Sequence, residues 1–197
     1  MPRPSLRDQR SREILDAFLT CAARYGLEGA TQERIALEAG VKRPLLRHYL
    51  GNRDEMVTAL CAHIVEEFDA LNEALADKLR DSGNLGDLID LLFDQASDTD
   101  PRLVLVFQAL TASAETYPQM RQPLLSSIDR FIGVIASFLR RTCASRRQLQ
   151  FNAVAHGLAA LFMSSDALSP LDPPPEWRQA TRRSATILVN SLEAEHP

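Results

Sequence analysis

Hydrophobic positions recur at helical spacing along most of this 197-residue chain. At roughly 100° per residue, apolar side chains three and four positions apart share one face of a helix. The pattern predicts three long helices, over residues 8–25, 53–79 and 124–141. Further helices are expected over residues 85–95, after Asp100-Pro101, from Ser145 to about residue 164 and over 176–193. No segment alternates convincingly with the period of a strand, so the fold class predicted is all-α. The apolar stripes of the three long helices are the clearest. They are Ile14, Phe18 and Ala22 in 8–25; Met56, Leu60, Ile64, Phe68, Leu71 and Leu75 in 53–79; and Leu125, Ile128, Ile132, Ile135 and Leu139 in 124–141.

Residues 31–50 predict two short helices around a tight turn. Thr31 is a good N-cap for a helix whose apolar stripe begins at Ile35 and Ala36. Gly40 can adopt the left-handed conformation that ends this helix. The second helix runs from about Lys42 to residue 50, and a proline at position 44 is tolerated because first-turn N–H groups have no intrahelical partner. The segment therefore reads as a helix-turn-helix.

The second of these helices has two different sides. Leu46, Tyr49 and Leu50 fall on one side and are expected to pack against the domain. The opposite side is expected to face outward. It carries Pro44, Leu45, Arg47 and His48, with Arg43 flanking.

The outward side is basic although the whole chain is acidic. The formal net charge of the chain is −4. Yet residues 1–56 hold 10 Lys and Arg against 8 Asp and Glu, and residues 41–53 contain Lys42, Arg43, Arg47 and Arg53 with no acid. Such a patch can neutralise phosphates and release counterions, so we predict that the segment binds DNA. The predicted DNA-binding residues are Thr31, Lys42, Arg43, Pro44, Leu45, Arg47, His48, Tyr49 and Arg53.

Within that set, the chemistry of the side chains suggests separate roles. Lys42, Arg47 and His48 are expected to contact phosphates and the groove. Arg43 is the best candidate to read a guanine edge, and Leu45 could contact thymine methyl groups.

Residues 12–56 resemble the N-terminal domain of the TetR family of transcriptional regulators. The resemblance rests on Tyr25-Gly26, Gly29-Ala30-Thr31, Ile35-Ala36, Ala39-Gly40-Val41, His48-Tyr49-Leu50 and Asn52-Arg53-Asp54-Glu55-Met56. It implies a homodimeric repressor that binds a palindromic operator and is released by a small-molecule effector. Lys42, Pro44, Arg47 and Leu50 stand where family members usually carry Ser, Gly, Tyr and Phe, so the target sequence cannot be carried over from relatives.

We predict two domains. Residues 1–52 form the three-helix DNA-binding domain, and residues 53–197 form a larger helical domain for effector binding and dimerisation. Asn52 and Glu55 resemble a capping box at the start of the long helix that follows. The helix from Arg146 is apolar nearly all round and rich in small residues, so burial between two subunits competes with burial inside one monomer.

The family resemblance also implies an effector pocket in the helical domain. His156 lies on the apolar helix and is expected to be a hydrogen-bonded core histidine more often than a ligand or a sensor. Ordinary core packing is the competing interpretation for every candidate. The candidates are Phe68, Phe107, Gln108, Tyr117, Met120 and His156.

Little in the sequence favours an enzyme. No Gly-rich phosphate loop, nucleophile elbow or His-Glu-x-x-His motif is present. His63 with Glu66 and Glu67 is the best metal candidate, but a di-metal bundle needs paired elements and this chain offers one. We therefore expect no metal and no cofactor. A helix-bundle metal enzyme and a DNA-binding adaptor that answers to a protein partner are the alternatives.

The cysteines and the hydropathy pattern indicate the compartment. Cys21, Cys61 and Cys143 are far apart and odd in number, as expected of buried thiols in a reducing environment. No signal-peptide pattern and no run of 18 apolar residues is found. We therefore expect a soluble cytoplasmic protein that does not enter a membrane.

Overall fold

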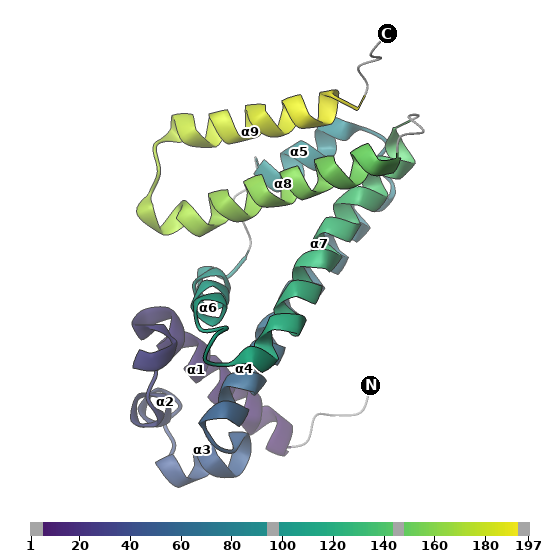
Figure 1. The fold of residues 1–197 in the computed structure, drawn as a ribbon. Coiled ribbons are helices and arrows are strands. Elements are labelled where there is room, and N and C mark those ends of the chain that lie inside the picture. Colours follow the sequence, from purple (N-terminus) through teal and green to yellow (C-terminus); the bar gives the residue numbers. More distant parts are fainter. Residues whose placement is uncertain (1–5, 94–98, 144–147, 193–197) are drawn as a thin grey trace. The chain divides into compact units, whose positions relative to one another are not determined.

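The structure, a computed structural model, describes residues 6–93, 99–143 and 148–192 (Figure 1). Every regular element in these ranges is helical, as the hydrophobic spacing predicts. None of these helices is long and apolar enough to cross a lipid bilayer. The elements are α1 (Leu6–Gly29), α2 (Gln32–Glu38), α3 (Arg43–Leu50), α4 (Arg53–Arg80), α5 (Leu85–Phe93), α6 (Pro101–Ala112), η1 (Pro118–Met120), α7 (Arg121–Thr142), α8 (Gln148–Leu168), η2 (Ser169–Leu171) and α9 (Pro175–Asn190).

The chain forms two compact units. The first unit comprises residues 1–68 and 99–126, and the second comprises residues 69–98 and 127–197. Helices α4 and α7 therefore contribute residues to both units. The functional division into residues 1–52 and 53–197 stays a prediction.

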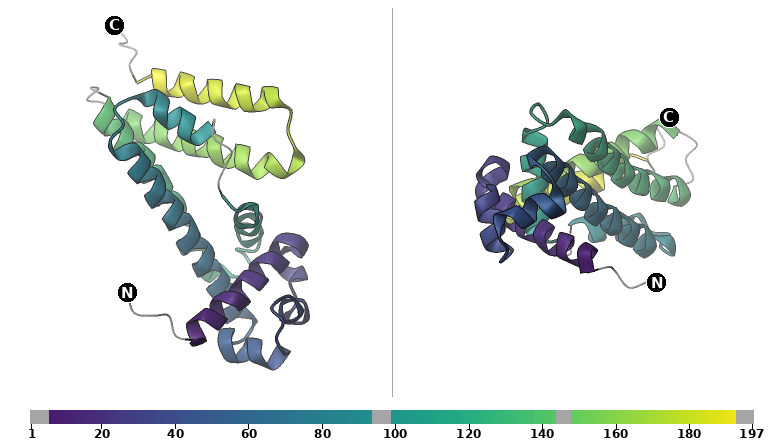
Figure 2. Two further views of the ribbon diagram at one scale, coloured as in Figure 1. Left: turned by 180° about the vertical axis from the view of Figure 1, so that it is seen from behind. Right: turned by 90° about the horizontal axis from the view of Figure 1, so that it is seen from below.

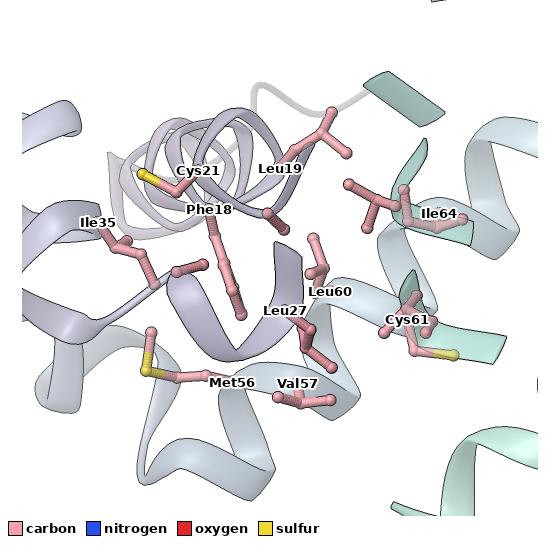
Figure 3. Close-up of a cluster of buried hydrophobic side chains, with 14 of the residues drawn as sticks. Phe18, Leu19, Cys21, Leu27, Ile35, Met56, Val57, Leu60, Cys61 and Ile64 are labelled. Carbon is pink, nitrogen blue, oxygen red and sulfur yellow. The ribbon is translucent and has the colours of Figure 1, made fainter. Parts of the chain in front are cut away.

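The first unit is built around a core shared by α1, α2, α3, α6 and the start of α4. Phe18, Ile35, Met56 and Leu60 are fully buried in it. Figure 3 shows these side chains gathered in the interior that the helices enclose. Because the first turns of α4 also belong to this core, both neighbours of α3 along the chain, α2 and α4, are fixed by packing.

The helix ends in the first unit follow the capping signals of the sequence. Helix α1 is interrupted at Gly26, which has φ 71°, so the predicted Tyr25-Gly26 stop is a kink after which helical turns continue to Gly29. The Asn52–Glu55 capping box is confirmed. The Glu55 N–H donates to Asn52 Oδ1 at 3.0 Å, and the Asn52 N–H donates to Glu55 Oε2 at 2.7 Å.

The second unit has its own core, formed mainly by α5, α7, α8 and α9. Helices α8 and α9 lie side by side in Figure 1 and in the reverse view of Figure 2. Gly157 permits this approach, because a Cβ at that position would lie 2.9 Å from Leu188 Cδ1. Helix α8 continues to Leu168, beyond the predicted end near residue 164, whereas the predicted N-cap Ser145 lies outside the described residues.

Two of the three cysteines are buried thiols, as expected. Cys21 and Cys61 are buried, and burial raises the pKa of both thiols. Cys143 is only partly buried. None of the three forms a disulfide with another described cysteine.

Candidate nucleic-acid interface

The turn between α2 and α3 is fixed by backbone geometry. Thr31 Oγ1 accepts a hydrogen bond from the Arg34 N–H at 3.4 Å and begins α2. At the other end, the Gly40 N–H donates to Leu37 O at 3.2 Å and the Val41 N–H donates to Ala36 O at 2.9 Å. These two bonds form a Schellman motif that satisfies the last carbonyls of α2, and Gly40 adopts it with φ 61°. The predicted glycine turn is therefore confirmed.

Helix α3 presents the two sides that its sequence predicts. Leu46 and Leu50 are buried and Tyr49 is half-buried. The side chains of Lys42, Arg43, Pro44, Leu45, Arg47 and His48 are all exposed. The ring of His48 lies 5.1 Å from the ring of Tyr49, edge to face, so the inner tyrosine supports the outer histidine.

Arg43 has partners on α2 that its place in the sequence does not reveal. Its Nη1 lies 2.6 Å from Glu33 Oε1, and its Nε donates to Gln32 Oε1 at 3.1 Å. Both partners lie in the first turn of α2. The guanidinium is thus held at the edge of the exposed face of α3, and all three side chains are at least partly accessible to solvent.

Arg53 is placed differently from the other predicted DNA-binding cations. Its Nη1 donates to Ala30 O at 2.8 Å, its Nη2 donates to Leu27 O, and its guanidinium lies 5.2 Å from the centre of the Phe18 ring. These contacts tie the start of α4 to the end of α1. Its position in the sequence suggested part of an outward basic patch, but its observed contacts are internal to the first unit.

The remaining cations give the exposed face its charge. Lys42 and Arg47 form no ion pair with any described acid, and α3 itself contains no acidic residue. We call the exposed side chains of Lys42, Arg43, Leu45, Arg47 and His48 the α3 outer face. A narrow cylinder with a basic, partly apolar outer side has the dimensions and charge that fit the major groove of B-form DNA.

Helix α1 is locked to α6 within the first unit by Arg102. Its guanidinium donates to Asp100, the N-cap of α6, at 2.7 Å, to Thr20 Oγ1 of α1 at 2.7 Å, and lies 3.1 Å from Asp16 Oδ1. Hydrogen bonds from Arg102 hold the pKa of Asp100 below its usual range. Helix α1, which packs against α2 and α3, is therefore coupled to α6 by charge as well as by packing.

The six predicted effector-binding residues do not gather in one compact unit. Five belong to the first unit and His156 belongs to the second. Phe68 and Phe107 meet edge to face at 5.5 Å, and Gln108 is exposed. Tyr117 and Met120 are buried in the first core, which agrees with ordinary packing. The expectation that His156 is a core histidine is wrong, because its side chain lies on an exposed side of α8.

The expected metal candidate is an isolated pair. His63 Nδ1 lies 3.9 Å from Glu67 Oε1 in consecutive turns of α4. Across the described ranges, no three side chains of His, Cys, Asp or Glu gather at one point.

The second unit also has a groove between α4 and α7 that the sequence does not reveal. It has a volume of about 480 Å³ and is lined by residues from Asp69 to Leu79 and from Arg130 to Arg141. Arg130 Nε donates to Asp69 Oδ1 at 2.7 Å, and Arg141 Nη2 donates to Leu79 O at 2.6 Å. No motif marks it, because it depends on how two long helices pack.

Comparison with known proteins points to one family. Residues 14–60 match the model of the bacterial regulatory proteins of the tetR family. The HTH-type transcriptional regulator BetI of Paraburkholderia phymatum is 25% identical over 99% of this chain and 98% of its own length. BetI of Brucella anthropi is 34% identical over 76 residues, which cover 38% of this chain and 39% of that protein.

Solved structures share the fold over nearly the whole chain. A TetR-family transcriptional regulator from Cytophaga hutchinsonii superimposes with a TM-score of 0.79 at 13% identity and covers 99% of this chain and 100% of its own. The multidrug binding protein EbrR, solved in complex with imidazole, gives a TM-score of 0.62 at 19% identity, covering 94% and 96% of the two chains. At these identities the likeness concerns the fold.

Proposed function

Since this chain belongs to the TetR family of DNA-binding transcriptional regulators, we propose that it is a homodimeric repressor released from a palindromic operator by a small-molecule effector. The family relationship places it among regulators and not among enzymes. The observation that carries the proposal is the α3 outer face. Its cations surround the exposed side chain of Leu45, and α3 contains no acidic residue.

Each residue of this face has a role in the proposed complex. Lys42, Arg47 and His48 contact phosphates and the groove wall, and Arg43 reads a guanine edge through its two Nη groups. Leu45, which is 40% exposed, packs against thymine methyl groups. Thr31, Pro44 and Tyr49 shape this surface, and Arg53 fixes α4 against α1 behind it.

The proposed dimer uses the exposed sides of α8 and α9. The interface is placed on one exposed stripe of these helices, in which His156 is the one ionisable residue; α9 also exposes Glu176, Arg178 and Arg183, which are not part of this stripe. Trp177 is 58% exposed, Ile187 is 64% exposed and Leu149 is 86% exposed. Large apolar side chains at helical spacing, without charges, are typical of a surface that a second subunit covers. The side chains of this surface are Leu149, Ala153, His156, Ala160 and Ser164 on α8 and Trp177, Ala180, Ser184, Ile187 and Ser191 on α9.

Pairing through this surface supports recognition of a two-fold symmetric site. A C2 dimer brings two copies of α3 to successive major grooves when their spacing is roughly 34–36 Å, one turn of B-form DNA. Repression then follows from occlusion of RNA polymerase. Effector binding acts through α4 and α6, which connect to the helix-turn-helix by shared core packing and by Arg102. A coupling free energy on the order of 1–3 kcal/mol is enough to change occupancy severalfold or more.

Selection of bound DNA from a random pool, repeated across a salt series, tests this proposal. We expect an enriched inverted repeat, and an affinity that falls steeply with salt because several phosphate contacts per subunit release counterions. If folded protein recovered only unrelated sequences, the result would contradict the proposal.

A further inference from the structure

Three phenylalanine rings from three helices meet at one edge of the second core. The ring of Phe162 on α8 lies 5.3 Å from that of Phe131 on α7 and 6.4 Å from that of Phe93 on α5. All three side chains are only partly buried, whereas Phe138 and Phe151 in the same core are almost fully buried. The aromatic cluster therefore keeps accessible ring surface where the core ends.

A carboxylate stands on the inward stripe of α8 next to this cluster. Asp166, which is half-buried, follows Phe162 by one helical turn, on the stripe that also carries the buried residues Ala155 and Ala159. Burial raises the pKa of the Asp166 carboxyl, and no nearby charge offsets this effect. Among the residues that the structure describes, none donates a hydrogen bond or an ion pair to it.

An acid at such a position needs a reason. An ionised carboxylate that loses hydration without gaining a partner destabilises the fold, so core stripes rarely carry one. A bound cation would supply the missing charge. Aromatic ring faces carry negative electrostatic potential and attract the same cation.

We propose that Phe93, Phe131, Phe162 and Asp166 form a site for a small organic cation with an apolar body, such as an alkyl- or arylammonium ion. This inference rests on the proposed function, because the cation would be the effector. The rings contact the apolar body and the ammonium group, and Asp166 neutralises the charge. An anionic ligand would meet the Asp166 carboxylate, on which no described cation acts.

The groove between α4 and α7 is the competing location. Its arginines are already engaged, Arg130 with Asp69 and Arg141 with the Leu79 carbonyl and, at 5.4 Å, with the Phe138 ring. Glu73 is its exposed carboxylate. Glu73→Gln is therefore a matched control, since it removes one negative charge from the other candidate site in the same unit.

Isothermal titration of the full chain with benzylammonium and benzyltrimethylammonium tests the site, with neopentylbenzene as the neutral isostere of the latter. We expect both cations to bind the wild-type protein and the neutral isostere to bind much more weakly. Asp166→Asn should lower cation affinity by about tenfold or more, because it removes a charge-assisted contact at constant side-chain size. Glu73→Gln should leave the affinity unchanged.

Phe162→Leu provides a second variant that keeps an apolar side chain but removes the ring face. It should weaken benzyltrimethylammonium binding more than neopentylbenzene binding, since only the cation gains from the ring potential. Each variant is first checked for cooperative unfolding.

The inference is overturned by any of three results. These are no binding of either cation to wild-type protein, equal binding of the cation and its neutral isostere, and loss of affinity in Glu73→Gln instead of Asp166→Asn. If the protein still selects an inverted repeat in these cases, the cation site alone is wrong. Failure to prefer any DNA sequence removes the proposed function, whatever the titration shows.

Discussion

Arg43 lies at the edge of the α3 outer face, where Glu33 and Gln32 hold its guanidinium. If Arg43 reads a base, Arg43→Ala should cost about 1–3 kcal/mol per half-site and relax the preference at one base pair. Glu33→Gln should raise affinity for random DNA, because it removes a negative charge beside the phosphates, and should lower discrimination. Fluorescence anisotropy with the selected operator and with scrambled DNA measures both. An equal loss on the two DNAs for Arg43→Ala would assign this residue to the backbone.

Asp166 links the stability of the protein to pH. Its pKa is raised above 3.8 in the folded chain by desolvation, so the folded state holds this proton to higher pH than the unfolded state does. Stability therefore falls as pH rises from about 3.8 through the folded pKa, and the full penalty is present above it. Asp166→Asn removes the penalty.

Urea unfolding of wild-type and Asp166→Asn proteins at a series of pH values measures this effect. We expect the variant to gain stability over the wild type as pH increases. Glu73→Gln, at an exposed carboxylate, is the control. A difference between Asp166→Asn and wild type that stays constant with pH would show that the carboxyl group is not desolvated.

The junction between α2 and α3 shows how far local signals determine an element. Thr31, Gly40 and Pro44 each predict a helix boundary from the chemistry of one residue, and the structure confirms all three. The outward orientation of Lys42 and Arg47 was predictable for the same reason, since helical periodicity fixes it once Leu46 is buried. The engagement of Arg43 and Arg53 was not, because their partners depend on how α2 and α1 pack nearby.

Helix α8 shows where periodicity fails. Its small residues are apolar all round, so the sequence cannot distinguish the side that faces α9 from the side that is exposed. The exposure of His156 and the inward position of Asp166 both follow from packing that no local signal reports. The groove between α4 and α7 is likewise a property of two helices together.

Gly40→Ala tests the geometry of the junction. A Cβ at Gly40 would meet no atom within 4 Å, so the cost comes from the left-handed backbone alone, roughly 1–2 kcal/mol. Gly83→Ala, at another glycine with open space around it, is the control and should be neutral or slightly stabilising. Thermal unfolding of the wild type and both variants measures this cost. If Gly40→Ala were as stable as the wild type, the turn would not require a left-handed residue at this position.

Recognition of a two-fold symmetric site by two copies of α3 requires the whole molecule to be a dimer. Ile187→Glu would place two like charges in a symmetric, apolar interface, so we expect it to shift the protein from a dimer toward the 21.9 kDa monomer. Gln179→Glu adds the same charge on the polar, exposed side of α9 and should leave the dimer intact. Sedimentation equilibrium measures the mass. If Ile187→Glu and Gln179→Glu had the same association constant, this surface would be excluded as the dimer interface.

Methylation protection of guanine N7 shows whether the α3 outer face enters the major groove, because N7 is exposed only in that groove. On the selected operator, we expect two protected blocks related by two-fold symmetry and separated by one turn of DNA, about 10 bp, or a multiple of it. Arg43→Ala should remove protection at one symmetric pair of guanines. Folded, dimeric protein that binds the operator without protecting any guanine N7 would show that α3 does not enter the major groove.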